Sequence, residues 1–183
     1  MNFFRTNLRH RHIPAFALVI AFSTTLSGCS GDEAKREYAI PRTLCGIAID
    51  SDGLTPFLPA GKKITVKGKS GGGINRCRVI VDDKIAATTT QAWLEDGRTT
   101  AYFATGQALD ALDHSADGDR FRYSGNEAFG KTRNCVDTKY EQELYTAVQV
   151  SGSKHHDADA MKRLIISYTS QVEQSAECSA GAL

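Results

Sequence analysis

The sequence predicts an α+β fold: an antiparallel sheet with a C-terminal helix packed on one face, held together by two disulfides. Several short segments alternate apolar and polar residues, which is typical of strands buried on one side. A longer segment, residues 157–173, repeats apolar residues at three- and four-residue steps, as an amphipathic helix does. Four widely spaced cysteines in the same part of the chain can form two pairs.

The first part of this region is predicted to form a three-stranded antiparallel meander. Its strands are expected at residues 64–69, 76–81 and 85–94. Two turns join them, a glycine-rich one at residues 70–73 and the pair Asp82-Asp83. On the middle strand, the residues expected to face the core are Cys77, Val79 and Val81.

The segments that flank the meander are predicted to be helical. Three prolines exclude a long helix from residues 41–59, so one or two single-turn helices are expected there, the second capped by Ser51 or Asp52. Residues 99–112 are predicted to form a longer helix, although Gly106 lowers its stability by about 1 kcal/mol relative to alanine.

Three further strands and the main helix complete the predicted domain. The strands are expected at residues 121–123, 128–136 and 144–150. In the last of them, one face is made of Leu144, Thr146, Val148 and Val150. The helix of residues 157–173 is expected to begin after Asp157, a natural N-cap, and to pack its apolar stripe on the sheet.

The N-terminus has the features of an export signal. Arg5, Arg9 and Arg11 give it a positive start, and an apolar run follows at residues 13–22. The run is about half the ~20 residues that a membrane-spanning helix needs. It is therefore expected to be a signal segment that is removed, and not a permanent membrane helix.

The export signal ends in Leu26-Ser27-Gly28-Cys29, which resembles the lipobox of bacterial membrane lipoproteins. The resemblance implies cleavage just before Cys29 and attachment of a diacylglycerol to its thiol, and two acyl chains suffice for stable anchoring. It gives a signal peptide at residues 1–28, a lipidated tether at residues 29–38 and one extracytoplasmic domain at residues 39–183. The alternative is an ordinary extracellular cysteine after a standard signal peptide.

Setting Cys29 apart leaves an even number of cysteines, namely Cys45, Cys77, Cys135 and Cys178. Disulfides persist in the oxidising environment that exported proteins meet. Three connectivities are possible, and we favour the sequential pairs, each of which contributes about 3–4 kcal/mol through loop-closure entropy. A metal site is the rival use of these cysteines, but their wide spacing, without any Cys-x-x-Cys, argues against it.

Charge and composition limit the partners. The chain has a formal net charge of +1, and the three arginines of the export signal exceed it, so the remainder is weakly acidic. Binding to nucleic acid needs clustered Lys and Arg, and we therefore expect no nucleic acid partner. The expected partners are the membrane, through the lipid on Cys29, and an envelope protein or a small-molecule ligand.

Residues 125–132 match the phosphate-binding pattern G-x-x-x-x-G-K-[ST], from Gly125 through Gly130 and Lys131 to Thr132. A P-loop joins a strand to a helix, whereas the residues after Thr132 lead into a strand pattern. A turn between antiparallel strands is the preferred interpretation, and nucleotide binding remains an alternative.

Residues 68–72 match G-x-S-x-G, the pattern around the nucleophile of many hydrolases, with Ser70 at its centre. Such a serine needs a strand-to-helix turn and a histidine base, and the histidines available are His114, His155 and His156. Here glycines and another strand follow, so a hairpin loop is preferred. An envelope hydrolase that uses Ser70 with a histidine remains an alternative.

The pair His155-His156, together with Asp157 and Asp159, could bind a divalent metal. Neighbouring residues of one loop seldom make a closed tetrahedral site, so a solvated loop and a helix cap are the simpler interpretation. We expect neither a metal nor a cofactor.

The domain resembles small actinobacterial lipoproteins of uncharacterised function. The resemblance depends on the lipobox, on residues 41–46 (Pro-Arg-Thr-Leu-Cys-Gly) and on the closing segment from Met161 to Cys178. It transfers no catalytic residue. We expect a lipid-anchored protein of the cell envelope that acts as a non-catalytic binding or interaction module on the extracytoplasmic face of the membrane.

Overall fold

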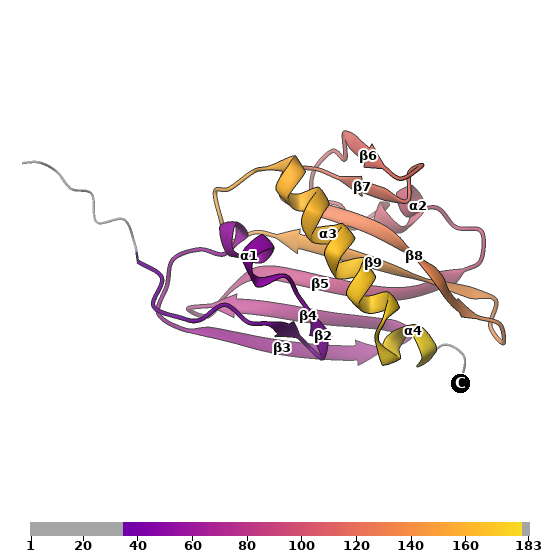
Figure 1. Ribbon diagram of the computed structural model, residues 1–183, viewed down its shortest axis with the longest axis horizontal. Coiled ribbons are helices and arrows are strands. Elements are labelled where there is room, and N and C mark those ends of the chain that lie inside the picture. Colours follow the sequence, from indigo (N-terminus) through magenta and orange to yellow (C-terminus); the bar gives the residue numbers. More distant parts are fainter. Residues whose placement is uncertain (1–34, 181–183) are drawn as a thin grey trace, which may run out of the picture. The chain divides into compact units, whose positions relative to one another are not determined.

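Seven antiparallel strands form one sheet within residues 35–180, the part of the chain that the computed structural model describes (Figure 1). They hydrogen-bond in the order β3-β4-β5-β9-β8-β7-β6. Their bounds are β3 (Ile64–Gly71), β4 (Ile74–Val81), β5 (Lys84–Glu95), β6 (His114–Ala116), β7 (Phe121–Tyr123), β8 (Glu127–Asp137) and β9 (Gln142–Val150). The predicted signal peptide and Cys29 lie outside the described residues.

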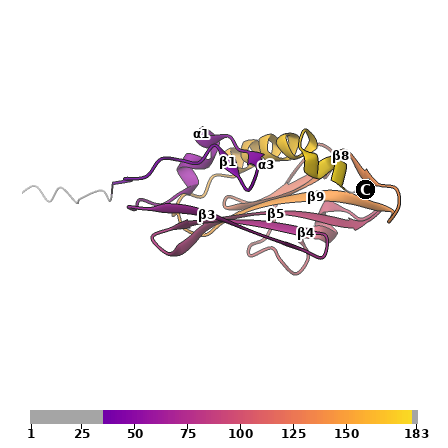
Figure 2. The ribbon, with the colours of Figure 1, turned by 90° about the horizontal axis from the view of Figure 1, so that it is seen from below.

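The remaining elements pack on the two faces of this sheet. They are β1 (Thr43–Leu44), β2 (Ile47–Ala48), α1 (Ser51–Leu54), the 3-10 helix η1 (Thr55–Phe57), α2 (Thr100–Ala104), α3 (Ala158–Glu173) and α4 (Ala176–Ala180). Figures 1 and 2 show α1, α3 and the β1–β2 hairpin on one face, which we call the helix-covered face. We call the other the open face. No helix within residues 35–180 combines the length and the apolar composition that a bilayer crossing requires.

Alternation along β9 assigns α2 to the open face. Thr146 hydrogen-bonds to Thr169 of α3, with 2.7 Å between the two hydroxyl oxygens. Its neighbour Tyr145 points the opposite way and packs against Phe103 of α2, with ring centroids 5.4 Å apart. The sheet therefore carries a separate apolar cluster on each side.

The predicted main helix is confirmed as α3. Asp157 is its N-cap, and the carboxylate accepts a hydrogen bond of 2.9 Å from the amide of Ala160. The apolar stripe is fully buried and consists of Met161, Leu164, Ile165, Tyr168 and Val172. Full burial of such a side chain contributes about 1.5–3 kcal/mol, so this stripe is a large part of the core.

The predicted meander is also confirmed, as β3, β4 and β5. Asp82 and Asp83 form its second turn with φ of 45° and 65°. Two successive positive values are typical of the tight turns whose twist matches a β-hairpin. Cys77, Val79 and Val81 are buried on the helix-covered face, as the alternation predicts.

The favoured sequential pairing of the cysteines is the one found. Cys45–Cys77 joins the β1–β2 hairpin to β4, and Cys135–Cys178 joins α4 to β8. Cys178 can reach its partner because α3 ends at Glu173 and a separate short helix follows. Both bonds fasten elements of the helix-covered face onto the sheet.

Residues 41–59 differ from the prediction in two ways. They contain the β1–β2 hairpin, which the sequence did not indicate, followed by α1 and η1. The cap of α1 is Asp50 and neither Ser51 nor Asp52. Asp50 has an extended backbone and its carboxylate accepts a hydrogen bond of 3.1 Å from the amide of Asp52, which is the geometry of an N-cap.

The helix predicted at residues 99–112 is wrong in extent. The helix stops at Ala104, and Gly106 has a φ of 80°, which ends helical geometry. The amides of Leu109 and Asp110 then bond to the side chain of Glu127 on β8, so the backbone follows the sheet instead of a helical axis. The short strand β6 that comes next was not predicted.

Three residues of the predicted tether contact the folded domain. Arg36 forms a bridge with Gly61, and its guanidinium donates to the carbonyls of Thr55 and Leu58 at 2.9 and 2.6 Å. The amide of Glu37 donates to the carbonyl of Gly61 at 2.8 Å. The hydroxyl of Tyr38 donates to the carbonyl of Pro59. The chain is therefore attached to the domain from Arg36 onward.

Candidate binding site

The open face is covered over only part of its width. Phe103 of α2 packs against Phe129 and Tyr145, with ring centroids 5.7 and 5.4 Å apart, and this cluster covers β8 and β9. Figure 2 shows the side of the sheet opposite α1 and α3, where β3 and β4 have no covering element. The uncovered area of the described domain is therefore formed by β3, β4 and the adjoining part of β5.

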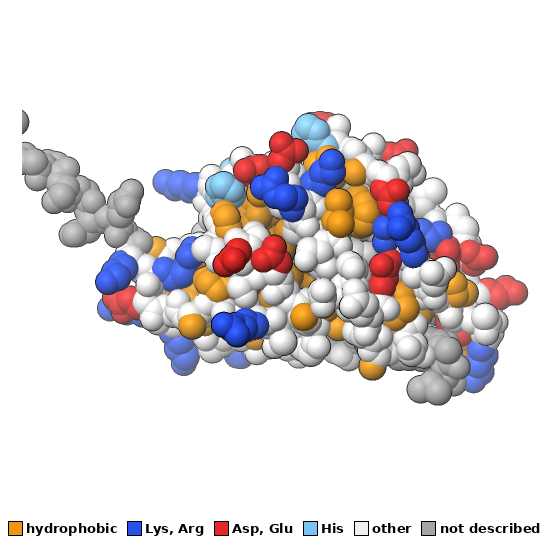
Figure 3. Space-filling view, in the orientation of Figure 1, with side chains coloured by type: hydrophobic (Ala, Val, Ile, Leu, Met, Phe, Trp, Pro, Cys, Tyr) orange, Lys and Arg blue, Asp and Glu red, His pale blue; other side chains and the backbone are white. Residues whose placement is uncertain are grey.

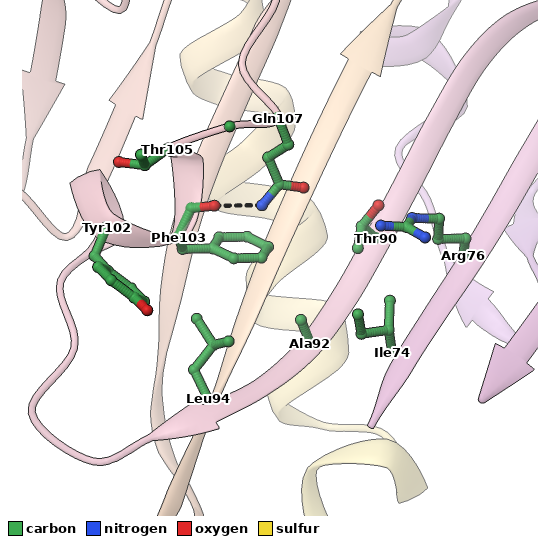
Figure 4. A pocket seen from close by; sticks show the side chains of 10 residues that line it. Ile74, Arg76, Thr90, Ala92, Leu94, Tyr102, Phe103, Thr105 and Gln107 are labelled. Atoms are coloured by element: carbon green, nitrogen blue, oxygen red, sulfur yellow. Dashed lines mark hydrogen bonds between the residues drawn. The ribbon is translucent and has the colours of Figure 1, made fainter. Parts of the chain in front are cut away.

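A cleft of about 340 Å³ lies where α2 meets this uncovered area (Figure 4). Its floor is apolar and comes from β4 and β5, through Ile74, Ala92 and Leu94. Tyr102 and Phe103 line the side that belongs to α2. Its volume is at the lower end of the range for small-molecule pockets, which are also mainly apolar.

The loop that continues this wall is fixed by a buried carboxylate. Glu127 is 1% exposed and accepts hydrogen bonds of 2.8 and 2.7 Å from the amides of Leu109 and Asp110. Gln149 donates to its other oxygen at 2.9 Å and to the carbonyl of Gln107, a cleft residue, at 2.8 Å. Buried polar groups are stable only when they are hydrogen-bonded. The bonds to Glu127 therefore hold the loop that forms this wall in one position.

Sequence reasoning missed Glu127 as a site residue. The available signal was a carboxylate inside a segment that otherwise alternates as a buried strand. Without knowing the fold, no pattern could indicate that the backbone of residues 107–110 is its partner.

A second hollow of about 140 Å³ adjoins the cleft on the open face. Its lining includes three basic side chains, Lys69, Arg76 and Arg78. The cleft and this hollow share Ile74 and Arg76, so they are neighbours, and together we call them the depression, with an apolar end and a basic end.

Four exposed cations occupy the basic end and its edge. They are Lys67 and Lys69 of β3 and Arg76 and Arg78 of β4. The register places Lys67 opposite Arg78 and Lys69 opposite Arg76. Among the residues that the structure describes, none of the four has a carboxylate within 4.0 Å. We call these four residues the basic quartet.

Within β3, β4 and β5, no acidic side chain lies on the same face as the basic quartet. The pairing of these strands assigns to that face, besides the quartet, only uncharged residues: Thr65, Gly71, Ile74, Ile80, Ile85, Thr88, Thr90, Ala92 and Leu94. On the next strand, β9, Glu143 lies opposite Leu94 and is paired with Lys131. The surface around the quartet is therefore locally positive although the whole chain is near neutral.

Ser70 is not brought to any histidine. It lies on β3, at one edge of the sheet, while His114 is on β6 at the other edge. The ring of His155 packs against Phe57, with centroids 5.1 Å apart. Gly68 of the same motif has a packing role, because a Cβ there would lie 3.1 Å from the sulfur of Cys45.

The segment that matches a P-loop is mainly strand β8, paired with β9. Lys131 is paired with Glu143; burial disfavours its charge, but the bond to Glu143 and the nearby Tyr145 hold its pKa above the usual value. Thr132 donates to the carbonyl of Leu144 at 2.7 Å. A Cβ on Gly130 would lie 2.8 Å from the ring of Phe121, so this glycine serves packing.

The histidine-rich loop before α3 serves structure. Asp157 caps α3, and its carboxylate lies 3.9 Å from Nε2 of His155. Across residues 35–180, no cluster of three or more His, Cys, Asp or Glu side chains is arranged to hold a metal ion.

The chain matches no protein-family model, and no curated protein and no solved structure is significantly similar to it. The two disulfides are consistent with a protein exported from the reducing cytosol.

Proposed function

We propose that this protein is a lipid-anchored binding module of the cell envelope and that its ligand site is the depression on the open face. The observation that carries the proposal is the contrast between the two faces. One is covered over most of its width by α1, α3 and the disulfide-bonded hairpin, while the other has an apolar cleft beside cations that have no carboxylate of the described residues within 4.0 Å.

Two features support the anchoring half of the proposal. The tetrad Leu26-Ser27-Gly28-Cys29 follows a basic and then an apolar segment, in the order that lipoprotein signals require. The disulfides are consistent with an oxidising compartment.

A binding role fits the described side chains better than the two enzymatic alternatives do. The serine of the hydrolase alternative and the histidines lie on separate elements. The lysine and threonine of the nucleotide alternative are used within the sheet, by Glu143 and by the carbonyl of Leu144.

Metabolic labelling with a palmitate analogue tests the anchor. We expect the wild-type chain to be labelled, processed and recovered with membranes. Cys29→Ala should abolish the label and leave a longer precursor, whereas the neighbouring Ser30→Ala should behave as wild type. Labelling and normal processing of Cys29→Ala would contradict the lipoprotein assignment.

Photo-crosslinking in living cells tests the site. Benzoylphenylalanine is placed at Tyr102, which is 51% exposed beside the cleft, or at Ile166, which is 39% exposed on α3. After irradiation, the full chain is purified and its intact mass is measured. A recurrent added mass at position 102 and none at position 166 is expected. No adduct, or equal adducts at both positions, would contradict a ligand site on the open face.

A further inference from the structure

We propose that the ligand is an anionic amphiphile bound as a single molecule, with its apolar part in the cleft and its acidic group on the basic quartet. This inference rests on the proposed function, because it names the class of ligand for the same depression. The acidic group is a phosphate or a carboxylate of a lipid-like molecule.

The cleft and the basic hollow adjoin each other. Ile74 and Arg76 line both of them, so a single molecule can occupy the cleft and extend along these two side chains to the basic hollow. Arg76 and Thr90 are register partners on β4 and β5, and Figure 4 shows the guanidinium beside Thr90 on one side of the cleft. An acidic group at this point is within reach of a planar, bidentate donor.

The charge pattern of the open face also favours an anion. Like charges directly opposite each other on neighbouring strands destabilise a sheet, and the basic quartet contains two such pairs. On the helix-covered side, by contrast, acidic and basic side chains are interspersed (Figure 3). A bound anion would neutralise the repulsion, which explains why an unfavourable arrangement is kept at this place.

Protection of the sheet edge explains only half of the quartet. Lysines on an edge strand discourage pairing with other chains, and β3 is an edge strand, so Lys67 and Lys69 fit that role. Arg76 and Arg78 lie on β4, which is paired on both sides. Their presence on the same face requires another reason, and an anionic ligand supplies it.

The shape of the apolar surface favours a single bound molecule over a membrane surface. Domains that dock on a bilayer insert protruding apolar side chains among the lipids. Here the apolar groups Ile74, Ala92 and Leu94 form the floor of a hollow and Ala92 is 2% exposed. The concave floor suits an apolar chain that enters the protein, with the exposed Tyr102 beside it.

Calorimetric titration of the full-length protein with hexyl phosphate tests the proposal. The protein is held in phosphatidylcholine nanodiscs, and empty nanodiscs give the background. Inorganic phosphate supplies the acidic group alone, and hexyl glucoside supplies the chain without the charge. We expect hexyl phosphate to bind about tenfold or more tightly than either. Burial of about two methylene groups suffices for that factor over inorganic phosphate. Loss of a charge-assisted hydrogen bond accounts for a similar factor over hexyl glucoside.

Two variants separate the binding role from a structural one. Arg76→Gln should weaken hexyl phosphate binding about tenfold or more, as expected for loss of a charge-assisted hydrogen bond, while its melting temperature stays equal or rises. Arg163→Gln removes the same charge from an exposed position on α3 and should bind as wild type does. A fall in melting temperature for Arg76→Gln, with unchanged affinity, would assign this arginine to structure and overturn the proposal.

The remaining outcomes are also decisive. Equal affinity for inorganic phosphate would remove the apolar half of the proposal, and equal affinity for hexyl glucoside would remove the anionic half. Binding to phosphatidylglycerol vesicles without binding to hexyl phosphate would show a docking surface instead of a single-molecule site. If hexyl phosphate fails to bind while crosslinking at position 102 succeeds, this inference is wrong and the proposed function stands; failure of both overturns both.

Discussion

Lys69 and Arg76 face each other across the β3–β4 hairpin, both exposed, with no carboxylate of the described residues within 4.0 Å of either. Natural sheets usually place opposite charges, or one charged and one neutral residue, at such positions, because facing like charges repel. The same arrangement recurs at Lys67 and Arg78, so the repulsion should have a measurable effect on the stability of the fold.

Reversing one charge of this pair should stabilise the fold. Lys69→Glu converts the repulsion with Arg76 into an attraction, and we expect a gain of about 0.2–1 kcal/mol in the free energy of unfolding. Urea denaturation at low salt measures it, and added salt should reduce it. Lys154→Glu, at an exposed position outside the sheet, is the control and should change stability less. A loss of stability in Lys69→Glu would show that these side chains do not interact as the register implies.

Removal of the charge of Glu127 should loosen the wall of the cleft. In Glu127→Gln, the amides of Leu109 and Asp110 lose a charged acceptor, and a cost of about 1–3 kcal/mol is expected for disturbing this buried group. Hydrogen exchange at those two amides should become faster than in the wild type. Exposed Glu141→Gln serves as the control. Unchanged exchange at both amides would refute the clamping role.

Each disulfide should contribute substantially to stability. The Cys135–Cys178 bond closes 43 residues and Cys45–Cys77 closes 32, for which loop-closure entropy gives about 4 kcal/mol each. Thermal or urea unfolding of the paired variant Cys135→Ser/Cys178→Ser should show a loss of this order. A reductant should then lower the stability of the paired variant further, through Cys45–Cys77, and the absence of such a decrease would mean that this second bond is not formed.

Stability should fall below pH 4 partly through Asp157. The hydrogen bond from the amide of Ala160 holds the pKa of Asp157 below its usual value of 3.8. The folded state therefore binds this proton more weakly than the unfolded state. Its stabilising effect is complete above about pH 4 and is lost as the pH falls through the lower, folded-state value. Asp82, which accepts from the amides of Lys62 and Lys63, acts in the same direction.

Asp157→Asn separates titration from capping, because asparagine caps helices well but does not titrate. Denaturation curves between pH 6 and pH 2 should show a smaller acid-induced loss of stability in Asp157→Asn than in the wild type. Asp157→Ala should be less stable at every pH. An identical pH dependence in the wild type and Asp157→Asn would assign the acid sensitivity to other carboxyl groups.

The elements that sequence predicts well here are those with a sustained pattern. The alternation through Cys77, Val79 and Val81 and the helical stripe from Met161 to Val172 depend only on which face is buried, so they could be recognised locally. The helix predicted at residues 99–112 ends at Ala104, and its length was overestimated because the effect of Gly106 was given too little weight. The path of the chain after Gly106 is fixed by Glu127, a residue distant in the sequence. Tertiary hydrogen bonds of this kind leave no local signal.

The candidate site could be predicted only in part, for the same reason. Each of the two strands has two basic residues separated by one residue of the opposite face: Lys67 and Lys69 on one strand, Arg76 and Arg78 on the other. The alternation therefore predicts one basic pair on one face of each strand. That β3 and β4 carry them on the uncovered side, next to α2, follows only from the register and from where α2 packs. The glycines of the two motifs around Ser70 and Lys131 are explained by packing, because Gly68 and Gly130 each leave too little room for a side chain.

The attachment of Arg36 beside Gly61 limits how far the cleft could lie from a lipid on Cys29. Gly61 precedes the start of β3, whereas the cleft adjoins Ile74 at the far end of the same hairpin, so roughly 26 Å of strand separates them. Cys29 precedes Arg36 by seven positions, which span about 25 Å when fully extended. A lipid on Cys29 would thus confine the mouth of the cleft to a layer roughly 50 Å deep above the bilayer. Ligand exchange would then be restricted to molecules that leave the membrane itself or pass within that layer.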